Sequence, residues 1–263
     1  MSKIIIITGG SSGIGLCTAK ALAKQGHTVY EFSRRESNHS GIYHLTADVT
    51  DEAAVQKAVD EVAAAHGRID VLINNAGFGI SGAVEFTKAE DAKRLFDVDF
   101  FGTVNATKAV LPYMRKQGAG RIVNISSVAA PVAIPFQTYY SAAKAAINSY
   151  TLALSNEVRP FGIEVCAVMP GDIQTGFTSA RDKSNDGDEI YGGRISRSVS
   201  VMEKDEQNGM SPEKAAGFIA RVATKKSVKP LYTLGFSYKF VVLLTKVLPV
   251  SVVNRVVSMI YAK

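Results

Sequence analysis

The chain has 263 residues, of which 46% are hydrophobic and 21% are charged, and its formal net charge is +6. This length and balance suit one large globular domain, and two cysteines are too few for a disulfide framework. The sequence also lacks a basic run for nucleic acid, a Cys/His spacing for zinc and an apolar stretch of about 20 residues for a membrane span. We therefore expect a cytoplasmic protein with no nucleic-acid partner and no metal, in which Cys17 and Cys166 are free thiols.

Strand and helix signals alternate along the chain. Short apolar runs predict strands over residues 4–7, 27–32, 42–46, 71–73, 121–125 and 163–168. Helical spacing predicts helices over residues 13–26, 51–66, 88–117 and 138–159. Gly26, Thr50 and Pro160 fit as a C-terminal stop, an N-cap and a helix breaker. The alternation predicts an α/β fold, a Rossmann-like doubly wound parallel sheet with helices on both faces.

Residues 177–210 interrupt this rhythm, because they are rich in Ser, Asp and Gly and sustain no apolar period. They follow the sixth predicted strand, at the carboxyl edge where such sheets bind ligands. The position favours a lid over a site, and a mobile surface loop is the alternative.

A glycine-rich loop, TGGSSGIG over residues 8–15, joins the first strand to the first helix. Glycine lets the backbone turn tightly and lets a pyrophosphate approach, while the helix N-terminus supplies free N–H groups and a positive dipole end. Because the strand–loop–helix context is met, the segment predicts a dinucleotide site. We assign residues 1–230 to a dinucleotide-binding domain and residues 231–263 to a C-terminal helical extension.

The end of the second strand discriminates between the two nicotinamide cofactors. An NAD site places Asp or Glu there for the ribose 2′-hydroxyl, whereas an NADP site has basic residues. In VYEFSRRES, Ser33 occupies the acid's position and Arg34 and Arg35 follow, which favours NADP(H) over NAD(H). A register shift of two residues would make Glu31 the ribose ligand, and the arginines could also belong to a solvated loop.

Ser127, Tyr140 and Lys144 form a candidate catalytic group. The tyrosine and lysine are four residues apart on one predicted helix, and the serine ends the strand before it. An ammonium beside a phenol favours the phenolate, so we expect a lowered tyrosine pKa. Such a tyrosine can exchange a proton with an alcohol or carbonyl whose oxygen the serine polarises. An isolated Y-x-x-x-K pair would be weak evidence, but here it accompanies a dinucleotide site.

In its motifs the chain resembles the single-domain branch of the short-chain dehydrogenase/reductase family. The matching segments, in the family's order and spacing, are TGGSSGIG (8–15), ADVT (47–50), NNAG (74–77), the serine of NISS, YSAAK (140–144) and PGDIQT (170–175). The longer C-terminal tail looks more like the hydroxysteroid and retinol dehydrogenase branch than like the fatty-acid-synthesis reductases.

This resemblance implies roles for the matched residues. Those implied for the pyrophosphate and ribose are Gly9, Ser11, Ser12, Gly13, Ile14 and Gly15. Those implied for the adenosine end are Asp48, Val49, Asn75, Ala76 and Gly77. Those implied for the nicotinamide end are Tyr140, Lys144, Ile173 and Thr175. Ser127 would bond the substrate oxygen, Tyr140 would be the general acid/base, and Lys144 would tune it.

Asp99 departs from the family pattern, which has an asparagine at this position that helps to hold a water linking the lysine to solvent. Aspartate keeps the acceptor oxygens and loses the amide donors. An ionised Asp99 near Lys144 would keep the ammonium charged and could weaken its effect on Tyr140. The alternative is that Asp99 accepts a bond from the helix or a water and changes little.

Two apolar regions bear on the substrate. The first predicts a pocket for an apolar alcohol or ketone and comprises Val128, Ala129, Pro131, Val132, Ile134, Pro135, Phe136 and Phe177. The second, residues 236–261, forms two apolar segments around Pro249, and residues 231–263 contain four cations and no acid. Three interpretations of this second region stay open: a pocket wall or lid, a subunit interface, or an amphipathic element on a membrane surface.

The leading hypothesis is an NADP(H)-dependent oxidoreductase of lipid metabolism that interconverts a secondary alcohol and a ketone. Its substrate would be lipophilic, either steroid-like or long-chain. One alternative is a dinucleotide-binding regulatory homologue with weak catalysis, supported by Asp99 alone. Another is a reductase of small polar carbonyls. We further expect a homodimer or homotetramer, with peripheral membrane contact through the C-terminal segment as an option.

Overall fold

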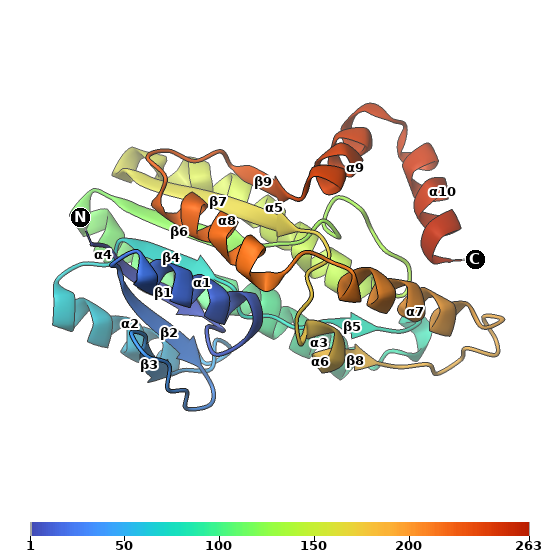
Figure 1. Cartoon of the computed structure of the whole chain (residues 1–263), viewed down its shortest axis with the longest axis horizontal. Coiled ribbons are helices and arrows are strands. Elements are labelled where there is room, and N and C mark those ends of the chain that lie inside the picture. The colour runs from blue at the N-terminus through green and yellow to red at the C-terminus, as the bar shows by residue number, and fades with distance from the viewer. Residues whose placement is uncertain (1, 263) are drawn as a thin grey trace.

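The computed structural model describes residues 2–262, so Lys263, one of the four tail cations, lies outside the described residues. Its centre is a seven-stranded sheet in the order β3-β2-β1-β4-β6-β7-β9, and every neighbouring pair is parallel (Figure 1). The strands are β1 (Ile4–Thr8), β2 (Thr28–Ser33), β3 (Tyr43–Thr46), β4 (Val71–Asn74), β6 (Gly120–Ile125), β7 (Ile163–Pro170) and β9 (Leu231–Leu234). The predicted doubly wound parallel sheet is confirmed.

Helices cover both faces of this sheet. They are α1 (Gly13–Lys24), α2 (Glu52–His66), α4 (Gly102–Gln117), α5 (Thr138–Val158) and α8 (Pro212–Thr224). α3 (Ala89–Phe96) packs against α5 instead, and short 3-10 turns lie at Val84–Phe86 and Arg159–Phe161. Along β1, Ile4 and Ile6 pack with α2, α4 and α5, whereas Ile5 and Ile7 pack with α1 and α8. Because β1 is buried on both faces, its residues 4–7 are all apolar and do not alternate with polar residues.

The predicted helix over 88–117 contains a change of geometry in its middle. After α3, residues Asp97–Phe101 form a π-helical segment, η2, and α4 continues from Gly102. A π segment widens one turn and often marks a functional position. Here it contains Asp99, which is fully buried.

The predicted helix ends are right at two positions and wrong at one. Gly26 has φ +84 just beyond α1, and α5 stops before Pro160. Thr50 is not the N-cap of α2: Asp51 is, accepting a hydrogen bond from the Ala54 N–H at 3.0 Å. The reason is that the Thr50 hydroxyl donates to Asp48 Oδ1 at 2.8 Å.

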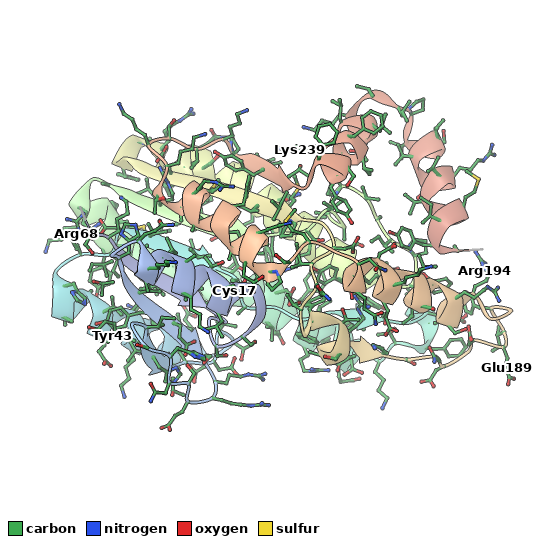
Figure 2. All side chains as sticks on the ribbon, in the orientation of Figure 1. Cys17, Tyr43, Arg68, Glu189, Arg194 and Lys239 are labelled. Carbon is green, nitrogen blue, oxygen red and sulfur yellow. The ribbon has the colours of Figure 1, made fainter. Side chains whose placement is uncertain are left out.

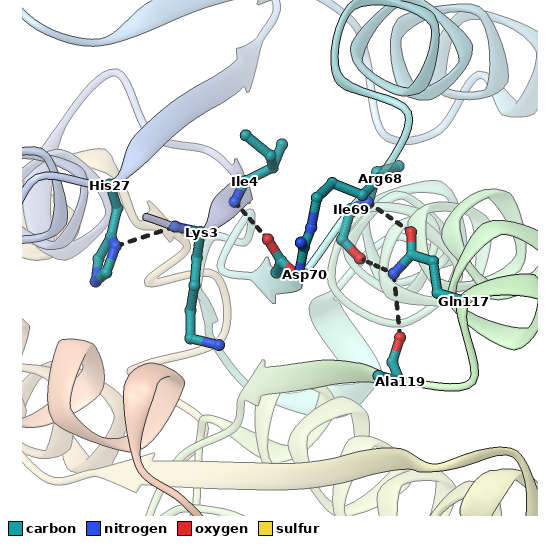
Figure 3. A network of polar contacts seen from close by, with 8 residues as sticks. All are labelled: Lys3, Ile4, His27, Arg68, Ile69, Asp70, Gln117 and Ala119. Carbon is teal, nitrogen blue, oxygen red and sulfur yellow. Dashed lines mark hydrogen bonds and ion pairs between the residues drawn. The ribbon is translucent and has the colours of Figure 1, made fainter. Parts of the chain in front are cut away.

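A polar network fixes the amino edge of the sheet (Figure 3). Asp70 Oδ2 accepts a hydrogen bond from the Ile4 N–H at 2.8 Å, and Arg68 pairs with the other carboxylate oxygen. Gln117 at the end of α4 bonds both the N–H and the carbonyl of Ile69, at 2.8 and 2.9 Å. These bonds tie β1, β4 and α4 together at the edge opposite the carboxyl ends of the strands.

Residues 177–210 contain more regular structure than the sequence pattern predicts. They form α6 (Phe177–Ala180), β8 (Asp182–Lys183) and α7 (Arg194–Gln207), and β8 pairs with β5 (Ile80–Ser81). The expectation that no apolar period is sustained is wrong for α7, because Ile195, Val199 and Met202 are buried at helical spacing. Serine and charged residues between them mask this short stripe.

Two helices follow the last strand: α9 (Phe236–Val247) and α10 (Val250–Tyr261). They project from one end of the sheet, and α10 returns toward α7 (Figure 1). Arg194 at the start of α7 donates to the carbonyl of Ala262 at 2.7 Å. Since β9 belongs to the central sheet, the helical part of the C-terminal segment begins at Phe236. Within residues 2–262, no helix has the length and apolar content to cross a bilayer.

Candidate active site

A cavity of about 890 Å³ lies at the carboxyl edge of the sheet. The residues that were assigned to the cofactor from the sequence all line it: Gly9, Ser11, Ser12, Gly13, Ile14, Gly15, Arg34, Arg35, Asp48, Val49, Asn75, Ala76, Gly77, Tyr140, Lys144, Ile173 and Thr175. Ser127 lines it as well, whereas Asp99 lies behind its wall. Parallel strands bring these distant segments together because their carboxyl ends share one edge.

The glycine-rich loop has no room for side chains where it approaches the cavity. Gly9 has φ +66, and a Cβ there would lie 2.9 Å from the Cα of Ala76. A Cβ on Gly15 would lie 2.3 Å from the carbonyl oxygen of Gly9. The side-chain amide of Asn75 donates to the carbonyls of Thr8 and Gly9, at 3.1 and 3.0 Å. The loop is thus fixed by β4 and presents bare backbone beside α1, a cradle that fits a pyrophosphate.

The residues at the end of β2 bear on which nicotinamide cofactor the cavity would take. Arg34 and Arg35 line the cavity beside Asp48, together with Ser33. Glu31 is fully buried under Gly10 and does not line the cavity; its carboxylate contacts Ser33, Ser37 and His44. The register shift that would make Glu31 the ribose ligand therefore does not occur.

The three candidate catalytic side chains come from β6 and α5. Ser127 follows β6, and its hydroxyl oxygen accepts a bond from the Ala129 N–H at 3.0 Å. Tyr140 and Lys144 occupy one face of α5, with the lysine Nζ 5.4 Å from the centre of the tyrosine ring. Lys144 also donates to the carbonyl of Ile125 at 3.2 Å, which holds the ammonium against the end of β6.

Asp99 forms an ion pair with Lys144, with Oδ2 3.0 Å from Nζ and both side chains buried. Its other oxygen accepts a hydrogen bond from the Phe78 N–H at 3.0 Å. A Cβ on Gly77 would lie 2.9 Å from Asp99 Oδ2, so the glycine of NNAG leaves space for this carboxylate. Asp99 therefore contacts Lys144, the candidate catalytic lysine, which the sequence raised as one of two possibilities.

The ionisation of the group follows from burial and from this ion pair. Burial favours neutral Lys144, but the Asp99 carboxylate outweighs it, together with Tyr140, and raises the pKa of the lysine. Burial raises the pKa of Tyr140; Lys144 and a hydrogen bond from Ser127 act against the rise, and Asp99 adds to it. The expected net fall of the Tyr140 pKa is thus wrong in direction, although Lys144 does act to lower it. The reason is that desolvation of the phenol is larger than the attraction of an ammonium shared with Asp99.

The predicted apolar pocket is correct for part of its residues. Val128, Ala129, Val132, Ile134 and Phe177 line the cavity. Three others do not: Pro131, Pro135 and Phe136. Phe136 has φ +59 and packs its ring with Ile195 and Ala262 instead. The sequence places these residues in one loop but cannot show which of them turn away.

The C-terminal helices form the far wall of the cavity. From α9, α10 and the turn between them come Tyr238, Val241, Leu244, Thr245, Leu248, Val253, Val256, Val257, Ile260 and Tyr261. Tyr238 attaches α9 to the end of β7, because its hydroxyl donates to Asp172 and its ring covers Gly171, where a Cβ would lie 2.1 Å from it. Of the three interpretations of this segment, the structure therefore realises the pocket wall.

Three carboxylates that the sequence reasoning missed also line the cavity: Asp172, Asp182 and Glu206. Glu206 is paired with Arg181 and accepts from the Thr178 hydroxyl at 2.6 Å. Burial raises the pKa of Asp172, and Asp205 and Glu206 add to the rise. Asp172 belongs to the PGDIQT motif, so its place in that motif was the available signal.

Comparisons with known proteins agree with this geometry. Residues 3–186 match the family model described as short chain dehydrogenase. A 3-ketodihydrosphingosine reductase from Bacteroides thetaiotaomicron is 46% identical over 228 residues, covering 86% of this chain and 85% of that protein. A short-chain dehydrogenase structure from Streptomyces avermitilis superposes with a TM-score of 0.82 at 31% identity, covering 91% of this chain and 90% of its own. The structure of ElxO with NADP bound has a TM-score of 0.75 at 28% identity, covering 91% of this chain and all of its own.

Proposed function

Because the chain belongs to the short chain dehydrogenase family, and is an oxidoreductase of that type, we propose that it reduces a ketone on a long-chain lipid with NADPH. The observation that carries the proposal is the continuity of one cavity. It runs from the glycine-rich loop past Tyr140 to the apolar faces of α9 and α10. A cofactor and an extended apolar substrate would thus meet at the catalytic tyrosine.

Each catalytic side chain has a defined part in this reaction. Bound NADPH would supply the hydride that reaches the carbonyl carbon. The Ser127 hydroxyl donates a hydrogen bond to the carbonyl oxygen, and Tyr140 transfers its proton to the same oxygen. The Lys144 ammonium then stabilises the phenolate, which recovers its proton from solvent. A tyrosine that stays protonated at neutral pH, as burial and Asp99 favour, suits the reductive direction.

The cofactor preference rests on Arg34 and Arg35 at the cavity and on the withdrawal of Glu31 beneath Gly10. An arginine fork pairs well with a 2′-phosphate, whereas a carboxylate at the ribose would repel it. The ElxO structure, which holds NADP, supports this choice by analogy.

The substrate class is suggested by the relative's name and by the charge on the cavity wall. We propose a 3-keto long-chain base, in which an amine neighbours the ketone. Asp172 lines the cavity with one oxygen held by Tyr238. An ammonium group near this carboxylate would gain a charge-assisted hydrogen bond that a neutral ketone cannot make.

The test is turnover of purified protein with 3-ketodihydrosphingosine, with a neutral long-chain ketone, with a steroid ketone and with a short polar ketone, each with NADPH and NADH. We expect the first substrate with NADPH to give the highest kcat/KM, and Asp172→Asn to raise KM for it alone. A preference for the steroid or for the short ketone would contradict the substrate proposal, and a preference for NADH the cofactor proposal.

The regulatory alternative is tested by Tyr140→Phe. Loss of turnover in this variant, with NADPH binding retained, would be the result expected of an enzyme. A wild-type turnover so weak that Tyr140→Phe does not lower it further would favour a regulatory homologue. The cytoplasmic location, the homodimer or homotetramer, and the division at residue 230 stay predictions.

A further inference from the structure

The outer faces of α9 and α10 expose a row of apolar side chains. On α9, Phe236, Phe240, Leu243 and Val247 recur at helical spacing and are 90%, 59%, 53% and 65% exposed. On α10, Val252, Val256 and Met259 form a second row, 44% to 49% exposed. A monomer rarely exposes so many large apolar residues on adjoining helices, so this surface has a partner.

The charge around these rows identifies the kind of partner. Lys239 and Lys246 lie on one flank of the α9 row, and Arg255 borders the row of α10; all three are exposed. Residues 231–263 contain no Asp or Glu. Figure 2 shows Lys239 on α9, far from Tyr43 at the other end of the sheet. Apolar side chains edged by cations are the pattern of a helix lying on an anionic membrane.

We propose that the α9–α10 surface, formed by Phe236, Phe240, Leu243, Val247, Val252, Val256 and Met259, docks on an anionic lipid bilayer. The same helices turn other residues, such as Val241, Leu244 and Ile260, into the cavity. Val256 belongs to both sets. A lipid substrate would therefore move from the bilayer to Tyr140 along an apolar path. This route rests on the proposed function, whereas the docking does not.

A second copy of the chain fits this surface less well. A two-fold interface would place Lys239, Lys246 and Arg255 opposite the same cations, with no acid in the segment to pair with them. Each helix has 12 residues, which suits lying along an interface and not crossing it. The bilayer surface satisfies both the apolar rows and the unmatched positive charge.

The first experiment is co-sedimentation of the full chain with vesicles of phosphatidylcholine alone and with added phosphatidylglycerol. We expect binding to the anionic vesicles at low salt, weakened by high salt. Lys239→Gln, Lys246→Gln and Arg255→Gln should each weaken it about fivefold. The double variant Phe240→Ser/Val247→Ser should abolish it, and Tyr43→Ser, equally exposed but distant, should not.

Activity separates the docking from the proposed chemistry. Phe240 and Val247 do not line the cavity, so the double variant should reduce a detergent-dispersed ketone at the wild-type rate and lose turnover of the same ketone in vesicles. Absence of sedimentation at low salt would overturn the docking, as would a wild-type dimer that the double variant dissociates. Failure of both ketone assays in a protein that still sediments would overturn the proposed function and leave the docking standing.

Discussion

At the scale of single residues, the candidate catalytic lysine contacts two side chains, one phenol and one carboxylate. Lys144 lies beside Tyr140 and pairs with the buried carboxylate of Asp99. Asp99 raises the pKa of Lys144 and so keeps the ammonium charged. Its negative charge also partly cancels the attraction of this ammonium for a phenolate. Asp99 itself acts on Tyr140 by raising its pKa. The departure from asparagine at this position should therefore be visible in the pH dependence of the reaction.

We expect Asp99→Asn to fold and to shift the pH–rate profile to lower pH. The sign follows because removal of a nearby negative charge lowers the pKa of Tyr140. Oxidation of the alcohol, which needs the phenolate, should reach its plateau at a lower pH than in the wild type. Reduction needs the protonated phenol, so as the pH is raised its rate should begin to fall at a lower pH than in the wild type. The measurement is kcat/KM against pH in both directions. An unchanged profile with unchanged turnover would make Asp99 catalytically neutral.

We expect the choice between NADPH and NADH to depend on Arg34 and Arg35. Replacing Arg34 and Arg35 with alanine should raise KM for NADPH by about tenfold for each lost contact and leave KM for NADH nearly unchanged. Steady-state kinetics with both cofactors measure this. Lys20→Ala, which removes an exposed cation outside the cavity, is the matched control. Equal losses with both cofactors would remove the arginines from the 2′-phosphate site.

At the scale of elements, contacts between α9 and the loop after β7 attach the apolar wall of the cavity to the carboxyl edge of the sheet. The ring of Tyr238 lies where a Cβ on Gly171 would be, and its hydroxyl bonds Asp172. Besides the contacts of this tyrosine, only Val242 of α9 is buried among the described residues of the helix, and it packs with Met169 of β7. The loop after β7 thus carries candidate cofactor residues on one side and positions the apolar cavity wall on the other.

Gly171→Ala should push Tyr238 away and loosen α9. We expect KM for a long-chain ketone to rise about tenfold, since apolar contacts along the wall are lost, with a smaller change for a short ketone. Tyr238→Phe is the companion variant, because it removes the bond to Asp172 and keeps the ring. If both substrates lose activity equally in Gly171→Ala, the glycine acts through the cofactor site instead.

Substitutions in the polar network at the amino edge should change the stability of the fold and leave the activity unchanged. Asp70→Ala leaves the buried N–H of Ile4 without its partner and should lower the free energy of unfolding by about 2 kcal/mol. Denaturant unfolding measures this, and kcat/KM should be unchanged because the network lies opposite the cavity. Arg68→Ala, which removes only an exposed ion-pair partner, should cost about 0.5 kcal/mol.

At the scale of the whole molecule, the two edges of one sheet differ in role: the amino edge stabilises the fold and the carboxyl edge forms the candidate site. Asp70 and Gln117 hold the amino edge together, and the carboxyl edge carries the glycine-rich loop and the candidate catalytic residues. The apolar wall of the cavity is added by α9 and α10, which follow the last strand of the sheet in sequence. The membrane-docking prediction belongs to this scale, since it depends on how these last helices present both faces at once.

Sequence alone determined the parallel sheet, the cofactor loop and the positions of Ser127, Tyr140 and Lys144. These features depend on local signals: continuous apolar runs, glycines at a strand–helix turn and two residues spaced by one helical turn. Tertiary structure decided the features that depend on packing between distant segments. Asp99 meets Lys144 through a π-helical turn, burial reverses the net pKa shift of Tyr140, and α9 and α10 close the cavity. Desolvation and side-chain orientation arise only when the chain is folded, so no spacing in the sequence could show them.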